Sequence, residues 1–393
     1  MIHLFGYEFQ RQGDFSIEPG QYGCVTVYSS NPYLVFMGTG SQPDTDFNFS
    51  MKCSMKDGTN GTIEFLYEKI KEHKYGKILF SVNGLVGCTI TIVSAVSFPL
   101  AKPVEGECKI QFPKCLAIGH RGMGANQVSS EYMENSMPGF FGAFIAKADC
   151  VEFDVQLSAE GTPVIYHDFF ILRDEKYPNI EPVKVKKNGK FAYSVSQLSN
   201  TQFMSSSLEL KWKALRPDFN ELMDHLPKSL MFDIEIKYPF SNRFDGKVPY
   251  PERNAFLQAT FDDMVIHMGE RPCFFSAFDP LIVAMLCTKQ RRWPVLQLIT
   301  VEKNETIDQF PIKVRALIPL HKKLGVIGFV ADSEKLLKFP DLIHDLQNEG
   351  FIVATYGKPN NTEDGIKQQI NLGIGAICAD LVPQLRKVID EIQ

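Results

Sequence analysis

From residue 115 to the end of the chain, short apolar runs alternate with longer stretches of helical character, and this alternation constrains the fold more than any other feature. The runs have the length and composition of strands. Because they are apolar throughout rather than at alternate positions, they predict a parallel sheet covered on both faces by helices. The expected strands are residues 115–120, 150–157, 163–167, 230–237, 273–278, 295–300, 326–331, 351–356 and 374–379. The expected helices are residues 136–148, 218–226, 254–268, 280–290, 334–348 and 362–372.

The number of strands favours a closed (β/α)₈ barrel of the TIM type over an open doubly wound sheet. Nine runs are one more than such a barrel needs. The turn at Gly161 between the second and third runs is too short for a parallel crossover, so we expect one of these two runs to be irregular. Residues 174–207 are polar and have no long helix pattern. They are either a loop inserted over the active-site face or a solvated surface loop.

Residues 1–108 have a different character, because short β-branched or aromatic runs are separated there by turn residues. The runs are residues 22–28, 62–67, 77–82 and 88–93. They predict a small all-β, sandwich-like accessory domain, joined through residues 101–107 to a barrel domain at residues 109–393. No residues there have catalytic or ligand spacing. We therefore expect an interaction or regulatory module with an unknown protein partner, and sugar or lipid binding is the alternative.

Composition restricts the class of protein further. The chain has 393 residues, which indicates two domains, and its formal net charge of −5 argues against a nucleic-acid binder. No apolar run is long enough to span a bilayer. The first residues contain no basic segment followed by an apolar one, so we expect no signal peptide. The nine cysteines are scattered without a Cys-x-x-Cys motif, which argues against a zinc site and favours a reducing compartment. We expect a cytoplasmic protein.

Carboxylates lie inside two of the expected strands. Glu152 and Asp154 share one face of a strand, because side chains at positions i and i+2 point the same way, and Glu235 with Lys237 repeats the pattern. Buried carboxylates need neutralising partners, and a divalent ion with oxygen ligands is one solution. Glu152, Asp154 and Glu235 are thus candidate ligands of Mg²⁺ or Ca²⁺. The alternative is a salt-bridge network with Lys237 and Arg121.

Two histidines, His120 and His167, each end an apolar strand, where barrels collect catalytic groups. Each is followed by a charged residue, Arg121 or Asp168. Such a pair suits a general base and a general acid on opposite sides of a phosphorus atom, and Arg121 offers a planar fork for phosphate oxygens. The alternative for each histidine alone is a structural role.

Other polar and aromatic positions are weaker candidates. Glu134 and Asn135 precede a helix, where they either support the site or cap the helix. Ser276 and Phe278 end a strand and either line the pocket or belong to a simple strand-to-helix turn. Tyr356 either stacks on a substrate cation or is a core aromatic residue. Asp380 either belongs to the site or caps the final segment of the chain.

These motifs, in order, resemble those of the glycerophosphodiester phosphodiesterase family, and they are most similar to its eukaryotic cytosolic glycerophosphocholine phosphodiesterases. The resemblance covers residues 114–393. The motifs are His120-Arg121-Gly122, Glu134-Asn135-Ser136, Glu152-Phe153-Asp154-Val155, Gly161-x-Pro163-Val164 with His167-Asp168, and Glu235-Ile236-Lys237.

The resemblance implies a (β/α)₈ barrel of the phospholipase-C-like phosphodiesterase type. It implies a divalent metal on Glu152, Asp154 and Glu235, and acid–base histidines at positions 120 and 167. It also implies phosphate contacts from Arg121 and Lys237, with Glu134, Asn135 and Asp168 in supporting positions. Thr355-Tyr356-Gly357 departs from the family, which commonly has a tryptophan and Thr-Val-Asn there. An aromatic residue that recognises choline is therefore not implied at this position.

The expected activity is metal-dependent hydrolysis of a small glycerophosphodiester, foremost glycerophosphocholine, to glycerol 3-phosphate and choline. Two alternatives remain. One is a lysophospholipase D-like phosphodiesterase acting on lysophospholipids. The other is a catalytically inactive protein that binds phosphate as a sensor or scaffold.

Overall fold

The computed structural model describes all residues except 1, 12–14, 19–32, 40–48, 56–59, 66–74, 83–84, 98, 107, 109, 111–113, 125–130, 186–188, 207–216, 218, 240–248, 302–305 and 393. For residues 2–96 it describes the backbone strands alone.

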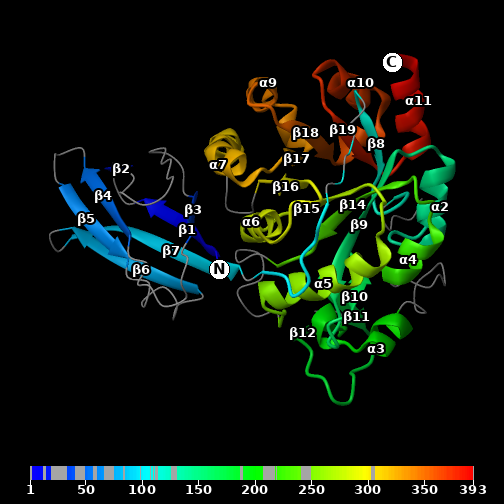
Figure 1. Cartoon of the computed structure of the whole chain (residues 1–393), viewed down its shortest axis with the longest axis horizontal. Helices are drawn as coiled ribbons and strands as arrows, with labels where there is room; N and C mark the ends of the chain where they lie inside the picture. The colour runs from blue at the N-terminus through cyan, green and yellow to red at the C-terminus, as the bar shows by residue number, and fades with distance from the viewer. Residues whose placement is uncertain are drawn as a thin grey trace.

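Eight parallel strands close into a barrel, and helices surround it (Figure 1). The barrel closes where β8 pairs with both β19 and β9. The predicted (β/α)₈ fold is therefore confirmed. The strands are β8 (Leu116–Gly119), β9 (Cys150–Leu157), β14 (Met231–Ile236), β15 (Cys273–Ala277), β16 (Val295–Ile299), β17 (Gly328–Asp332), β18 (Ile352–Tyr356) and β19 (Ala376–Ala379).

The ninth expected strand, β10 (Pro163–Ile165), is not a barrel strand but the second arm of a hairpin. It runs antiparallel to β9 and pairs with Val155, Gln156 and Leu157. On β9, the short strand β8 pairs only with Cys150 and Val151. The later residues on the same edge of β9 are therefore available to pair with β10. The irregular member of the pair is therefore the second run.

The barrel helices follow the expected positions with two additions and one division. Helices α7 and α11 were not predicted, and the single helix expected at 334–348 is two helices, α8 and α9. The division falls at Pro340, which has no backbone N–H to donate and disfavours helical backbone at the residue before it. The helices are α2 (Met137–Ile145), α4 (Phe219–His225), α5 (Arg253–His267), α6 (Pro280–Lys289), α7 (Gln309–Leu324), α8 (Ser333–Leu336), α9 (Pro340–Asn348), α10 (Glu363–Asn371) and α11 (Val382–Ile392).

The polar segment after β10 is a small packed unit rather than a solvated loop. Strands β11 (Phe170–Arg173), β12 (Lys184–Val185) and β13 (Phe191–Ser194) form a sheet of their own. The turn η1 (Val195–Gln197) and helix α3 (Asn200–Ser205) follow. Buried side chains shared with β10 hold the unit together: Val164, Ile171, Tyr193, Val195, Leu198 and Phe203.

The described part of the N-terminal region contains antiparallel strands in two sheets. One sheet has the order β3 (Tyr33–Thr39), β1 (Ile2–Arg11), β7 (Leu85–Ser97), β6 (Tyr75–Val82), and the other has the order β2 (Phe15–Glu18), β4 (Phe49–Met55), β5 (Asn60–Phe65). Three expected strands, at 62–67, 77–82 and 88–93, correspond to β5, β6 and β7, and the fourth, at 22–28, lies outside the described residues. The sandwich arrangement and the boundary at residue 108 stay predictions.

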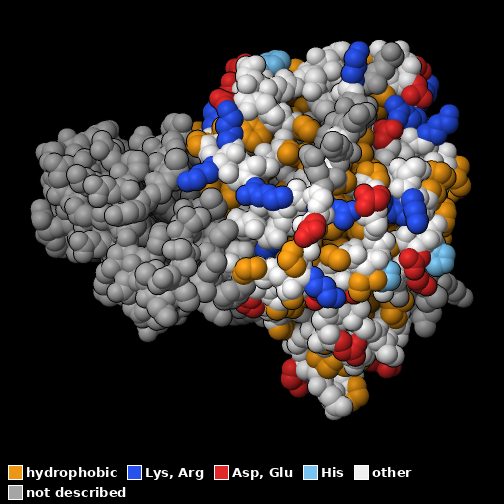
Figure 2. Space-filling model, in the orientation of Figure 1, with side chains coloured by type: hydrophobic (Ala, Val, Ile, Leu, Met, Phe, Trp, Pro, Cys, Tyr) orange, Lys and Arg blue, Asp and Glu red, His pale blue; other side chains and the backbone are white. Residues whose placement is uncertain are grey.

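Among the described residues, no helix has the length and apolar character needed to cross a membrane. On the face shown in Figure 2, basic and acidic side chains are interspersed over the described part of the surface.

Candidate functional site at the carboxyl ends of the barrel strands

The inward-facing side chains of β9 and β14 change from apolar to polar along each strand. Cys150 of β9 belongs to the apolar cluster inside the barrel, and Glu152, Asp154 and Gln156 follow it at steps of two residues. Met231 of β14 starts the same kind of row, which continues with the three polar side chains of Asp233, Glu235 and Lys237. Alternate residues of a strand share a face, so the polar ends of these rows meet above the apolar interior.

Three carboxylates from these two rows converge. Oxygen atoms of Glu152, Asp154 and Glu235 lie within 4.8 Å of one another, and all three residues are buried. The pKa of Glu152 is raised well above its usual value, because burial disfavours the charged form and Asp154 and Glu235 add negative charge nearby. Burial alone would also raise the pKa of Asp154, but Lys237 and other nearby cations lower it overall.

Two cations accompany the carboxylates. Nζ of Lys237 lies 2.7 Å from Glu235 and 3.2 Å from Oδ1 of Asp154, and Nε of Arg121 lies 3.7 Å from Oδ2 of Asp154. The contact of Oδ1 with Lys237 is an ion pair without hydrogen-bond geometry, so this buried oxygen accepts no hydrogen bond. A buried carboxylate oxygen that still lacks a hydrogen-bond donor, within a set of oxygen ligands only, fits a hard divalent cation such as Mg²⁺ or Ca²⁺. The cluster also contains the ion pairs that the alternative interpretation predicted.

Arg121 is held in place by the loop that precedes α2. Its Nη1 donates to Glu134 at 2.8 Å, and its backbone N–H donates to Glu152 at 2.8 Å. Asn135 donates from Nδ2 to Asp154 at 2.9 Å. Both Arg121 (φ 48°) and Asn135 (φ 53°) have left-handed backbone, which is strained for residues with a side chain and is found where surrounding contacts enforce it. The side chain that caps α2 is Ser136, so Glu134 and Asn135 are engaged with the site instead.

Each histidine pairs through Nδ1 with a carboxylate. Nδ1 of His120 lies 2.7 Å from Asp380, and Nδ1 of His167 lies 2.8 Å from Asp168. Asn361 holds Asp380 at two points, donating to its carboxylate at 2.9 Å and accepting from its backbone N–H at 2.8 Å. A carboxylate on Nδ1 selects the tautomer in which Nε2 carries the lone pair. Nε2 is thus the atom through which each imidazole can exchange protons.

The three candidate pocket residues have different surroundings. Ser276 is 1% exposed and donates to Asp233 at 2.7 Å, while burial raises the pKa of Asp233 to about 8. Phe278 and Tyr356 are partly exposed, and their rings meet edge to face with centroids 6.1 Å apart. Nζ of Lys237 lies 5.8 Å from the ring centre of Phe278. The aromatic pair therefore borders the same site as the carboxylates.

The sequence candidates did not include three residues of the site, Asp233, Gln156 and Asn361, and Asp380 was considered only as a possible cap of the final segment. Asp233 and Gln156 continue the inward rows at steps of two, which is a signal that the strand pattern contained. Asp380 follows β19 directly, as His120 follows β8, and only the pairing of these two strands brings the residues together. No sequence signal distinguishes Asn361 from an ordinary loop asparagine.

The chain was compared with known proteins. The model of the glycerophosphoryl diester phosphodiesterase family matches residues 120–383. The chain is 28% identical over 330 residues to glycerophosphodiester phosphodiesterase GDPD3 of Arabidopsis thaliana, covering 78% of this chain and 87% of that protein. It is 25% identical over 416 residues to glycerophosphocholine phosphodiesterase GPCPD1 of Rattus norvegicus, covering 88% of this chain but only 60% of that protein. A solved structure of an Oleispira antarctica phosphodiesterase, in complex with the product sn-glycerol-3-phosphate, aligns with a TM-score of 0.52 at 16% identity, covering 70% of this chain and 96% of that one. At this identity the likeness concerns the barrel fold alone.

Proposed function

Because the chain belongs to the glycerophosphoryl diester phosphodiesterase family and is thus a phosphoric diester hydrolase, we propose that it hydrolyses glycerophosphocholine to glycerol 3-phosphate and choline. The family expected from the motifs is confirmed. The observation that carries the proposal is the convergence of Glu152, Asp154 and Glu235 beside two carboxylate-paired histidines. The names of the plant and rat relatives, a glycerophosphodiester phosphodiesterase and a glycerophosphocholine phosphodiesterase, support this substrate class.

Glu152, Asp154 and Glu235 would hold a divalent cation, Mg²⁺ or Ca²⁺. When bound, such an ion supplies positive charge that polarises a phosphoryl oxygen. Arg121 and Lys237 lie against the same carboxylates, where they would contact the two non-bridging oxygens of the phosphodiester. Together these groups stabilise the negative charge that develops on the phosphoryl group in the transition state.

His120 and His167 exchange protons through Nε2. One takes the proton of the attacking hydroxyl group, and the other protonates the leaving alkoxide oxygen. Asp380 and Asp168 keep the two rings in the required tautomer. The nucleophile is either water or the 2-hydroxyl group of the glycerol. Product analysis separates the two, because only the second route passes through a cyclic phosphate.

The head-group preference rests on the aromatic pair of Phe278 and Tyr356. Aromatic faces attract quaternary ammonium groups, so these rings favour choline as the alcohol. Replacing Tyr356 by Leu should raise KM for glycerophosphocholine more than KM for glycerophosphoinositol, whose head group has no cation. Equal changes for the two substrates would contradict this assignment.

A cytoplasmic location belongs to the same proposal. The described cysteines, Cys108, Cys115, Cys150, Cys273, Cys287 and Cys378, are all free thiols, as expected in a reducing compartment. Cell fractionation tests this location.

One experiment tests the activity. Purified full-length protein is incubated with glycerophosphocholine, glycerophosphoethanolamine, glycerophosphoinositol and lysophosphatidylcholine, before and after EDTA treatment, and then with Mg²⁺ or Ca²⁺ restored. We expect glycerol 3-phosphate and choline from glycerophosphocholine, loss of turnover with EDTA and recovery with metal. Preferential turnover of lysophosphatidylcholine would replace the proposal with a lysophospholipase D-like activity. Absence of turnover on every ester with metal present would leave a binding protein.

A further inference from the structure

Gln156 is the last inward-facing residue of β9, four positions after Glu152 and two after Asp154. Its side chain is fully buried, at 0% exposure. A buried amide is costly unless its donors and acceptor are satisfied, so its partners show what the side chain holds.

The amide nitrogen of Gln156 holds the backbone on both sides of His167. Nε2 donates to the carbonyl of Tyr166 at 2.7 Å and to the carbonyl of Asp168 at 2.9 Å. Among the described residues, the His167 ring hydrogen-bonds to Asp168, which is the next residue and whose side chain is 69% exposed. Because that pair joins adjacent residues of one segment, it does not hold the segment against the carboxylates. Gln156 lies on β9 with Glu152 and Asp154, so its hydrogen bonds can hold this segment in place relative to the carboxylates.

The amide oxygen of Gln156 extends the connection to β14. The hydroxyl group of Tyr250 is shared between Oε1 of Gln156, at 3.2 Å, and the carbonyl oxygen of Lys237, at 2.5 Å. The Tyr250 ring is packed by Phe256 at a centroid distance of 5.7 Å and by Tyr238 at 5.2 Å. One buried amide therefore connects the backbone around His167 with that of the phosphate-binding lysine.

We infer that Gln156 is a positioning residue, which sets where the His167 imidazole lies relative to Asp154 and Lys237. The inference rests on the proposed function, because it needs His167 to act on the substrate. Reacting groups displaced by about 1 Å can lose roughly 10²-fold in rate, so the loss of these hydrogen bonds should act on kcat. KM should change little, because the ion pairs of Arg121 and Lys237 with the carboxylates do not involve Gln156.

The test is a double-mutant cycle with His167. Gln156→Met preserves the length of the side chain and removes its hydrogen bonds. We expect it to lower kcat by about 10- to 100-fold with KM little changed. In a His167→Ala background the same change should cost less than about 2-fold, because residues that act as a unit are not additive. An equal loss in both backgrounds would show a general structural role and overturn the inference.

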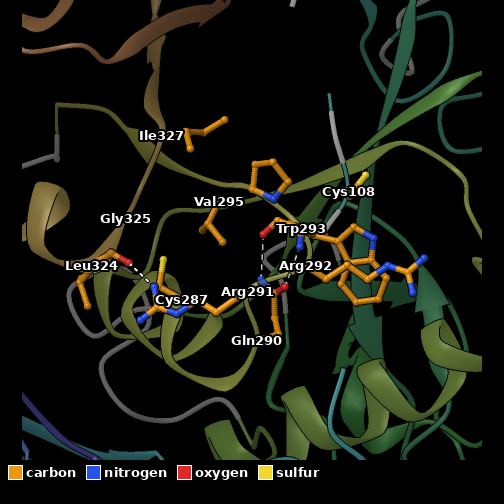
Figure 3. A pocket seen from close by; sticks show the side chains of 11 residues that line it. Cys108, Cys287, Gln290, Arg291, Arg292, Trp293, Val295, Leu324, Gly325 and Ile327 are labelled. Atoms are coloured by element: carbon orange, nitrogen blue, oxygen red, sulfur yellow. Dashed lines mark hydrogen bonds between the residues drawn. The ribbon is translucent and has the colours of Figure 1, made fainter. Parts of the chain in front are cut away.

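Gln290→Met is the matched control. Gln290 is also buried and brackets the backbone of Trp293, donating to its carbonyl at 2.9 Å and accepting from its N–H at 2.7 Å (Figure 3). It borders a cavity of about 160 Å³ at the opposite, amino end of β16. The control should lose a similar amount of thermal stability and keep kcat. A similar loss of kcat in the control would overturn the inference.

Tyr250→Phe keeps the test usable if Gln156→Met does not fold. It removes the shared hydroxyl group and retains the stacked ring, so we expect a smaller loss of kcat that also disappears in the His167→Ala background. A loss that persists there would contradict the inference. The experiment distinguishes failure of the proposed function from failure of this inference. If His167→Ala keeps full activity, the catalytic assignment of His167 is wrong. If His167→Ala is impaired but the effects of the two substitutions are additive, only the role of Gln156 is wrong.

Discussion

Asp380 accepts a hydrogen bond from Nδ1 of His120 at 2.7 Å, although 260 positions separate the two residues in the chain. They meet because β19 pairs with β8 in a register that sets Ala379 opposite Gly119, so the next residue of each strand faces its counterpart. The backbone N–H of His120 also donates to the carbonyl of Ala379 at 3.0 Å. The last barrel strand therefore supplies the residue that orients the histidine of the first.

Asp380→Asn should lower kcat by about 10²- to 10⁴-fold with little change in KM, because the amide no longer enforces the tautomer with a free lone pair on Nε2. Asn361 donates to the carboxylate of Asp380. In the variant, the new side-chain NH₂ group would therefore either face the NH₂ group of Asn361 or point toward Nδ1 of His120. Steady-state kinetics measure the effect. Asp390→Asn, which removes an exposed partner of Arg386 on α11, is the control and should be silent. Near-normal kcat in Asp380→Asn would show that His120 does not exchange the proton.

Mg²⁺ or Ca²⁺ should raise the melting temperature of the wild-type protein, because a ligand that binds only the folded state stabilises it. Glu152→Gln removes one of three charged ligands and should abolish most of this shift at the same metal concentration. Thermal unfolding with and without EDTA measures it. Glu270→Gln, at a side chain that is 96% exposed, should retain the full shift. An undiminished shift in Glu152→Gln would mean that the metal binds elsewhere.

Gly122→Ala should destabilise the protein by about 1–3 kcal/mol more than Gly161→Ala. Both glycines have left-handed backbone, with φ of +87° and +77°, so both variants bear the same conformational strain. A Cβ atom at position 122 would lie 2.8 Å from the backbone carbon of Gly139, whereas nothing lies within 4 Å at position 161. Urea unfolding gives both free energies. Similar losses for the two variants would show that the loop beside Arg121 can relax.

His321 should make the protein acid-sensitive. Burial lowers its pKa to about 3, and its ring stacks on Phe329 with centroids 5.1 Å apart. In the unfolded chain this histidine binds a proton below about pH 6.5, whereas in the folded protein it stays neutral down to about pH 3. His321 therefore does not reduce the free energy of unfolding above pH 6.5, and it reduces that free energy progressively as the pH falls from 6.5 toward 3. Within this window it should cost about 1.4 kcal/mol per pH unit. In His321→Gln the slope of the unfolding free energy against pH should therefore decrease by the amount that one proton taken up on unfolding contributes. His344→Gln, a change at an exposed residue, should leave this slope unchanged.

The barrel and the convergence of its three buried carboxylates were predictable because both rest on local patterns. Fully apolar strands predict a parallel sheet, and carboxylates two residues apart predict a shared face, as Glu152 and Asp154 show. Helix α7 was missed because it contains Pro319 in its interior, a residue that ordinarily ends a helix pattern.

Contacts between distant segments were not predictable in the same way. Asp380 and His120 meet through strand register, and Tyr250 reaches Gln156 across 94 positions of the chain. No periodicity in the sequence encodes such pairs. The hairpin arm β10 has the composition of a barrel strand. The short turn at Gly161 makes it antiparallel to β9, and the shortness of β8 leaves the edge of β9 where it pairs available.

The segments that carry His120 and His167 are both hydrogen-bonded through their backbone to the same edge of β9. The carbonyl of Glu152 accepts from the N–H of Gly122 at 3.2 Å, and the carbonyl of Asp154 accepts from the N–H of Tyr166 at 2.9 Å. Carbonyls two residues apart on a strand are spaced by roughly 7 Å, so the geometry of β9 itself sets the spacing between the two histidine-bearing segments. The packed unit that begins at β11 branches off after this attachment. It can lengthen, shrink or change its surface without altering this spacing, so the surface of the unit and the separation of the two histidines can vary independently.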